Sequence, residues 1–237
     1  NVCENHLDKS LKDNGYQVVL LAKSKKGYHN LAKMASIAFI DGFYYIPRID
    51  KRIIEQYKED VIVLSGGVNG EIPNMILNVG EKQAEEALLW WKETFGSDFY
   101  LEISDHEQEN EKHINEVLIG FSKKHKVKLV ATNNTFYLNK DDSLAHDILL
   151  CVKDGEKIAT PKGRGRGFRY GLPNDEYYFK GQDEMKKLFQ HVPEAIINIQ
   201  EIVDKVEIFD LAREVLLPKF SMPEKFYDQK DDYFELY

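Results

Sequence analysis

One loop of the predicted sheet holds polar side chains at a place where chemistry is expected. The stretch VKLVATNNTFYL, residues 127–138, starts as a β-branched apolar run and ends in a Thr-Asn-Asn triplet. That pattern is typical of a buried parallel strand that breaks into a loop. In α/β folds, catalytic and metal-binding groups lie in the loops that follow such strands. Asn133, Asn134 and Phe136 occupy this place, yet none of them is a carboxylate, an imidazole or a thiolate.

A histidine follows another predicted strand, at residues 99–103. His106 lies in the sequence Ser-Asp-His-Glu, which could supply ligands to a metal. The alternative is a helix N-terminus in which Asp105 caps the helix and Glu107 favours its dipole. Read without context, the cluster favours the helix cap, because most clusters of this kind are caps.

Two further segments offer chemistry with a simpler alternative. Ser65-Gly66-Gly67 follows the predicted strand 61–64 and could hold a phosphate through backbone amides. A tight turn is favoured, because the chain has no phosphate-binding or dinucleotide-binding glycine motif nearby. His146 and Asp147 are neighbours in a predicted helix and point apart, which favours a packing histidine over a metal site.

Three arginines form the candidate nucleic-acid contact. Arg164, Arg166 and Arg169 lie in the segment RGRGFR and could touch a phosphate backbone. A solvated loop is the favoured interpretation, because the chain around the segment is acidic. The sequence contains no nucleophile elbow and no H-E-x-x-H motif.

Composition limits the class of protein. The chain has 237 residues, 43% of them hydrophobic, and a net charge of −8. The acidic balance argues against a main role in binding nucleic acid, because phosphate neutralisation needs surplus lysine and arginine. No apolar run reaches the roughly 20 residues that span a bilayer, and the first ten residues do not have the pattern of a signal peptide. Two cysteines cannot form a disulfide framework, so we expect a reducing, cytoplasmic location.

The elements that must position these residues alternate between strand and helix. This alternation predicts the α/β class, with a parallel sheet in an open or barrel form. Residues 154–176 are predicted to be an exposed loop, and the chain from Leu211 onward resembles a linker. Strands are predicted over 17–22, 61–64, 99–103, 127–132 and 177–179, and helices over 28–40, 53–57, 71–77, 82–95, 107–126, 141–152, 183–191 and 193–206.

The order of several sequence blocks resembles a known family. The blocks are VVLLAKSKKGYHNLAKMASIAFIDGFYYIPRIDK, VIVLSGGVNGEIP, FYLEISDH, LVATNNTFYLNKDDSLAHDILLCV, PEAIINIQEIVDKV and LLPKF. In this order they resemble the PHP (polymerase and histidinol phosphatase) domain of bacterial DNA polymerase III alpha subunits, over most of residues 16–220. The resemblance implies a distorted seven-stranded β/α barrel at 1–210, expected to lack its first strands. Helices at its end would lead to a linker and the polymerase region at 211–237.

The resemblance also implies which residues stand at the family's metal-ligand positions. Metal-binding members hydrolyse phosphate esters with metal-bound water, and their first ligands, including an H-x-H pair, are expected upstream of Asn1. A later ligand position falls at Gly67, and a ligand histidine falls at His106. The Asp and His of a T-N-D-x-H block fall at Asn134 and Phe136. Because an amide is a weak ligand and a phenyl ring is none, His106 is the one retained ligand-type residue.

The resemblance therefore implies a degenerate PHP domain without a metal cluster, a cofactor or phosphoesterase activity. The parent protein would be a DNA-directed DNA polymerase, with magnesium held by carboxylates outside this chain. Expected partners are the polymerase core, a proofreading exonuclease subunit, other replisome subunits and DNA through the parent, but no membrane. The alternative is a live metal-dependent phosphoesterase or proofreading exonuclease. Open sheet edges also predict that the chain could form a homodimer.

Overall fold

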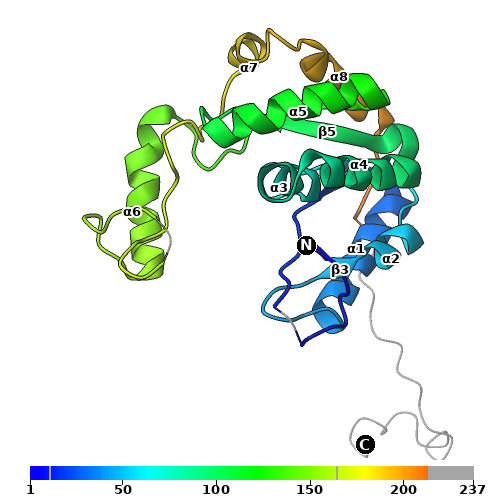
Figure 1. The fold of residues 1–237 in the computed structure, drawn as a ribbon, viewed down its shortest axis with the longest axis horizontal. Helices are drawn as coiled ribbons and strands as arrows, with labels where there is room; N and C mark the ends of the chain where they lie inside the picture. The colour runs from blue at the N-terminus through cyan, green and yellow to red at the C-terminus, as the bar shows by residue number, and fades with distance from the viewer. Residues whose placement is uncertain (11, 164, 213–237) are drawn as a thin grey trace, which may run out of the picture.

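The computed structural model describes residues 1–10, 12–163 and 165–212, and their class is mixed α/β (Figure 1). A four-stranded sheet has the order β2-β4-β5-β6, and a two-stranded parallel sheet pairs β1 with β3. The predicted strands 17–22, 61–64, 99–103 and 127–132 correspond to those of the larger sheet. The strands are β1 (Val2–Cys3), β2 (Val19–Ala22), β3 (Ile49–Asp50), β4 (Val61–Leu64), β5 (Phe99–Ser104) and β6 (Lys128–Thr132).

The direction of β2 differs from the predicted parallel sheet. β4, β5 and β6 are parallel, whereas β2 runs antiparallel to β4, with Val19 opposite Leu64. Two helices, α1 and α2, lie between β2 and β4, where a parallel crossover has one. The prediction was wrong at this strand because the alternation pattern does not specify in which direction the chain returns to the sheet.

The sheet is open in the part of the chain that the structure describes. β2 and β6 are its edges, and no closed seven-stranded barrel forms among these residues. The predicted strand 177–179 makes one isolated bridge, between Tyr137 and Tyr178. The described residues therefore establish a mixed α/β fold but not a barrel.

The predicted helices are all present, with ends that differ by a few residues. The largest shift at a start is at α1, which begins at Lys25 because the Ser24 side chain accepts the Gly27 N–H as a cap. The predicted Asp50 cap of α2 is confirmed. The helices are α1 (Lys25–Ile40), α2 (Lys51–Gln56), α3 (Glu71–Asn78), α4 (Glu81–Phe95), α5 (Glu109–His125), α6 (Ser143–Asp154), α7 (Gln182–Leu188) and α8 (Glu194–Lys205), with 3₁₀ turns η1 (Gly96–Asp98) and η2 (Lys140–Asp142).

Strand β4 of the larger sheet is buried on both faces. On β4, Val61 and Val63 belong to the main core, which α3, α4 and α5 complete. Ile62 faces the opposite side, where Ile202 of α8 packs against it. A strand that is buried on both faces has a continuous apolar sequence. The apolar run VIVL therefore predicted both ends of β4 correctly.

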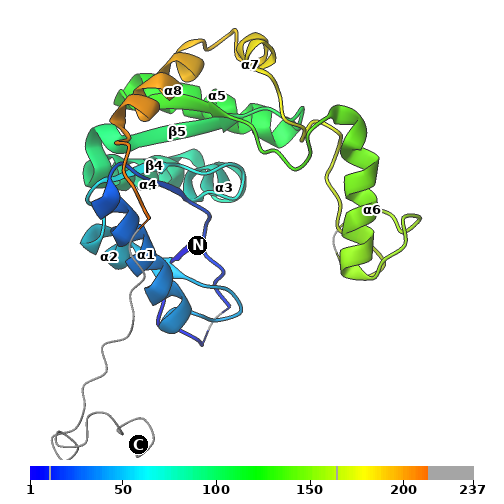
Figure 2. The ribbon, with the colours of Figure 1, turned by 180° about the vertical axis from the view of Figure 1, so that it is seen from behind.

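Helix α6 lies away from the rest of the molecule. Figure 1 and Figure 2, which are opposite views, both show α6 and the segment that returns from it as an arm beside the main body. The tail predicted at 211–237 lies outside the described residues from residue 213 onward. In the described ranges, no helix combines the length and apolar character needed to cross a membrane.

A buried carboxylate anchors the N-terminal part of the fold. The Asp50 side chain caps α2 and also accepts hydrogen bonds from Arg52 Nη2 at 2.6 Å and His6 Nδ1 at 2.7 Å. Burial alone would raise the pKa of Asp50. The hydrogen bonds from Arg52, His6 and the Ile53 amide outweigh burial and lower that pKa to about 2.

We predict that Asp50→Asn lowers the free energy of unfolding by about 1–3 kcal/mol near pH 7, because a hydrogen-bonded charge is lost. A depressed folded-state pKa stabilises the protein above the unfolded-state value of about 4. That stability is lost as the pH falls towards about 2. Urea unfolding at several pH values should show the difference between variant and parent shrinking across this window. A constant difference at pH 6 and pH 2 would contradict the assignment.

Candidate functional site

The carboxyl ends of β4, β5 and β6 meet at a cavity of about 550 Å³. The wall of this cavity includes the candidate ligand positions that follow each strand. They are Gly67 after β4, His106 after β5, and Asn134 with Phe136 after β6. The tertiary structure thus brings together the four positions that the sequence selected. This is the usual location of a site in an α/β fold.

His106 is buried, with 1% of its surface exposed, and both of its ring nitrogens are bonded. Nδ1 lies 2.8 Å from Glu111 Oε1, and Nε2 lies 3.1 Å from the backbone nitrogen of Asn134. A backbone N–H can only donate, so Nε2 accepts and Nδ1 carries the proton that it donates to Glu111. The lone pair that a metal would use is therefore engaged by a peptide N–H.

The surroundings of His106 fix its position further. Its backbone N–H donates to Glu111 Oε2 at 2.7 Å, and its carbonyl accepts the side-chain amide of Asn174 at 2.7 Å. The ring of Tyr177 stacks on the imidazole, with centroids 4.4 Å apart. These contacts are those of a packed core histidine. The sequence analysis did not identify Glu111 as the partner of His106. An acidic residue in the first helical turn after a loop histidine could have indicated such a partner.

The other three positions supply no metal-binding side chain. Gly67 has no side chain, and no atom lies within 4 Å of the place that a Cβ would take there. Asn134 contributes its backbone N–H to His106, and the Phe136 ring packs edge-on against Tyr177, with centroids 6.0 Å apart. Within the described ranges, no three His, Cys, Asp or Glu side chains are placed to hold a metal ion together. The side chains at these four positions do not fit the metal cluster of metal-binding PHP domains.

The loops around His106 and Gly67 are turns. Gly66 has φ +80°, which glycine adopts without strain, and the Gly70 N–H donates to the Gly67 carbonyl at 2.7 Å. The loop after β4 therefore contains a turn, in agreement with the turn interpretation of Ser65-Gly66-Gly67. The predicted helix cap at Asp105 is wrong. Asp105 Oδ1 accepts the Glu107 N–H at 2.9 Å and closes a turn, and Glu107 has φ +60°. Because this left-handed residue interrupts the helix, α5 begins two residues later, at Glu109.

A half-buried glutamate that the sequence analysis missed lies in the same cavity. Glu102 is on β5, and its Oε1 accepts the Thr132 hydroxyl at 2.7 Å. Its Oε2 is buried and has no hydrogen-bond partner among the described residues. Burial raises the pKa of Glu102, against the opposing effects of the Thr132 hydroxyl and the Gly66 amide. The signal was a charged residue in an otherwise apolar strand.

The charges around the cavity do not suit a phosphate ester. Glu102 and Glu111 lie on its wall, and the described lining residues include no lysine or arginine. Sites that bind phosphates use guanidinium or ammonium groups, backbone amides or metal ions to neutralise the charge. A phosphodiester in this cavity would face two carboxylates without a balancing cation from these residues.

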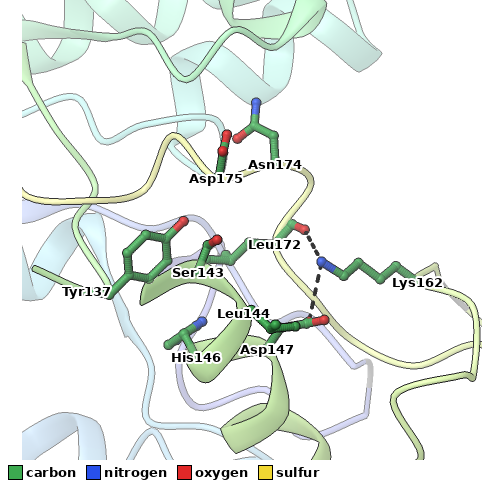
Figure 3. Close-up of a pocket in the computed structure, with 9 residues that line it drawn as sticks. All are labelled: Tyr137, Ser143, Leu144, His146, Asp147, Lys162, Leu172, Asn174 and Asp175. Carbon is green, nitrogen blue, oxygen red and sulfur yellow. Dashed lines mark hydrogen bonds and ion pairs between the residues drawn. The ribbon is translucent and has the colours of Figure 1, made fainter. Parts of the chain in front are cut away.

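A smaller cavity of about 290 Å³ lies beside α6 (Figure 3). Its wall includes Asp147, and the Lys162 ammonium lies 3.4 Å from the Asp147 carboxylate and donates to the Leu172 carbonyl. His146 packs near Tyr137, with ring centroids 5.4 Å apart, which confirms the packing interpretation. The charged groups Asp147 and Lys162 in its wall are paired with each other and with neighbouring protein groups.

The pairing of Asp147 corrects one of the predicted nucleic-acid contacts. Arg169 is 5% exposed, and its guanidinium donates two hydrogen bonds of 2.8 Å to Asp147 and another to the Thr160 carbonyl. A buried, bidentate arginine cannot also contact a phosphate backbone. Arg166 is exposed and stays a prediction, while Arg164 lies outside the described residues.

Comparison with known proteins bears on the family of the chain. Residues 3–106 match the model of the PHP domain family. The chain is similar to the DNA polymerase III subunit alpha of Borreliella burgdorferi, at 38% identity over 212 residues, covering 89% of this chain and 18% of that protein. The same subunit of Thermus aquaticus is 35% identical over 222 residues, covering 90% of this chain and 18% of that protein.

Residues 3–106 therefore carry a PHP domain, and most of the chain is similar to DNA polymerase III alpha subunits, as the resemblance predicted. The chain spans 18% of the length of these relatives.

We predict that His106→Ala lowers the free energy of unfolding by about 2–4 kcal/mol, because it leaves Glu111 and the Asn134 N–H unpaired in the interior. The matched control is His113→Ala on the same loop-and-helix segment, where the side chain is exposed. The control should change the unfolding free energy by less than about 0.5 kcal/mol. Equal urea-unfolding midpoints for the two variants would show that His106 is not a core residue.

Proposed function

We propose that this chain is a non-catalytic PHP domain of a replicative DNA polymerase III alpha subunit, with a structural and docking role. The observation that carries the proposal is the state of His106. Both of its ring nitrogens are bonded within the protein, and the three neighbouring ligand positions offer no carboxylate, imidazole or thiolate. A divalent ion would have to break buried hydrogen bonds and would gain a single imidazole ligand.

The activity of the parent protein is part of the same proposal. The relatives carry the name of a DNA polymerase III subunit, and the chain spans 18% of their length. We assign DNA-directed DNA synthesis, with its magnesium and its main DNA contact, to the parent outside this chain. A cytoplasmic location, an exonuclease partner and other replisome partners follow from that assignment.

The fold proposal concerns the barrel. Three parallel strands deliver their carboxyl ends to one cavity, as the strands of a β/α barrel do. We propose that this sheet is part of the distorted barrel that the family resemblance implies. Pairing of two copies through an open edge, β2 or β6, stays a prediction.

The outer face of α6 is the surface that best supports docking. Ile148, Leu149 and Val152 lie on one side of this helix and are 47%, 63% and 73% exposed. The opposite side is held by Asp147 and Cys151, which are buried. An exposed apolar stripe on a protruding helix marks an interaction site, and we assign it to the polymerase core of the same polypeptide.

The metal test separates this proposal from a live phosphoesterase. We expect the purified full-length protein to hold less than one zinc or manganese ion per PHP domain. Its manganese-dependent hydrolysis of bis(4-nitrophenyl) phosphate should not exceed that of the His106→Gln variant. The triple variant Gly67→Cys, Asn134→Asp and Phe136→His restores ligand chemistry and serves as a positive control for metal content. The space beside the Gly67 Cα is open for the new cysteine. Clustered metal in the parent protein, lost together with hydrolysis in His106→Gln, would refute the proposal.

The docking test uses two matched leucines. Leu149 on α6 and Leu89 on α4 are both exposed on helices, at 63% and 43%. In the full-length protein, Leu149→Asp should lower the free energy of unfolding of this domain by about 1–3 kcal/mol, because a charge enters an apolar interface. Leu89→Asp should have a smaller effect. In the 237-residue chain alone, the two variants should unfold alike; a selective loss there, or none in the full-length protein, would contradict the assignment.

A further inference from the structure

The cavity at the strand ends contains a charge that the proposed function does not use. Glu102 Oε1 is bonded to the Thr132 hydroxyl, while Oε2 is buried without a partner in the described part of the chain. An ionised carboxylate oxygen in such a place is costly unless a counter-charge or a donor satisfies it. The position therefore calls for a ligand that brings hydrogen-bond donors.

The Gly66 amide lies close enough to lower the pKa of Glu102, but Oε2 accepts no hydrogen bond from the described residues. Glu111 is also acidic, and its two oxygens are engaged by the ring and the backbone of His106. Among the described lining residues no lysine or arginine is present, so no internal ion pair competes for Glu102. The site thus has an excess of negative charge in a partly enclosed space.

The rest of the wall excludes two classes of ligand. Anions are disfavoured because Glu102 and Glu111 repel them. A bare divalent ion is disfavoured because no group of three acidic, histidine or cysteine side chains is placed to bind it in the described residues.

The wall instead suits an organic cation. Its aromatic side chains, Phe136, Tyr170 and Tyr177, can contact a cation or its carbon atoms through their ring faces and edges. The volume, about 550 Å³, lies in the range of small-molecule sites. At Gly67 the wall has no side chain, and the space beside its Cα is open.

We propose that this cavity binds an ammonium or guanidinium group, with the Glu102 carboxylate as its counter-ion and Phe136, Tyr170 and Tyr177 as its aromatic wall. The group could be carried by a small free amine or by a basic side chain of a bound protein, since both present the same chemistry. The proposal does not depend on the absence of phosphoesterase activity, because it uses Glu102 rather than the ligand positions of the family. The bonded ring of His106 remains in place as one side of the site.

The experiment titrates the full-length protein with agmatine, which carries a guanidinium and an ammonium group, by isothermal titration calorimetry. N-butylurea is the neutral control of similar shape. We expect saturable binding of agmatine, and at least a roughly tenfold loss of affinity, equal to about 1.4 kcal/mol, in Glu102→Gln. The matched control Glu109→Gln removes an exposed carboxylate on α5 and should bind as the parent does.

A second variant keeps the charge and fills the space. Gly67→Leu introduces a side chain into the open space beside the Gly67 Cα and leaves the residue Glu102 unchanged. It should abolish agmatine binding while urea unfolding stays cooperative. The tripeptide Ac-Ala-Arg-Ala-NH₂ is titrated in parallel, and the tighter of the two probes identifies a free amine or a protein side chain as the source.

Three outcomes would overturn the proposal. The first is that neither cationic probe saturates the protein at about 10 mM. The second is that N-butylurea binds as tightly as agmatine. The third is that agmatine binds unchanged to both Glu102→Gln and Gly67→Leu. None of these results bears on the metal test, so the two proposals fail separately.

Discussion

The hydrogen bonds of one buried histidine, made by its ring and its backbone, hold the site together. His106 connects the end of β5 with Glu111 on α5, with the Asn134 backbone after β6 and with Asn174 in the segment that returns from α6. Each partner would be left with an unsatisfied polar group if the histidine moved, and such groups cost free energy in an interior. The geometry of the cavity therefore depends on this residue, whatever the cavity binds.

This constraint changes what the site can do. A ligand histidine needs a free lone pair, and here a peptide N–H occupies it. The fold retains the place where an α/β protein concentrates its chemistry, while the side chains at that place now serve packing. Glu102 is the exception, because one of its oxygens is buried without a partner in the described chain.

A second charge network supports the arm separately. The bidentate pair between Arg169 and Asp147 joins α6 to the loop that follows it, and Lys162 adds a further contact to Asp147. With its polar side occupied by these internal bonds, α6 presents its apolar side outward. The segment that returns from α6 also reaches the cavity, because Tyr170 lies on the cavity wall and Asn174 donates to the His106 carbonyl.

The sequence by itself determined the class, the helices and most of the strands, because apolar periodicity and the Asp50 and Gly66 turn chemistry are local properties. It also selected the cavity through Gly67, His106, Asn134 and Phe136, by family resemblance. Only the tertiary structure decided the antiparallel direction of β2, the partners of His106 and the burial of Arg169. It also decided that Glu102 bonds through one carboxylate oxygen while the other is buried without a partner in the described chain. Each of these depends on contacts between residues far apart in the chain, such as Arg169 with Asp147 or Glu102 with Thr132. A local pattern shows that a side chain is charged, but the folded chain decides whether a partner stands opposite it.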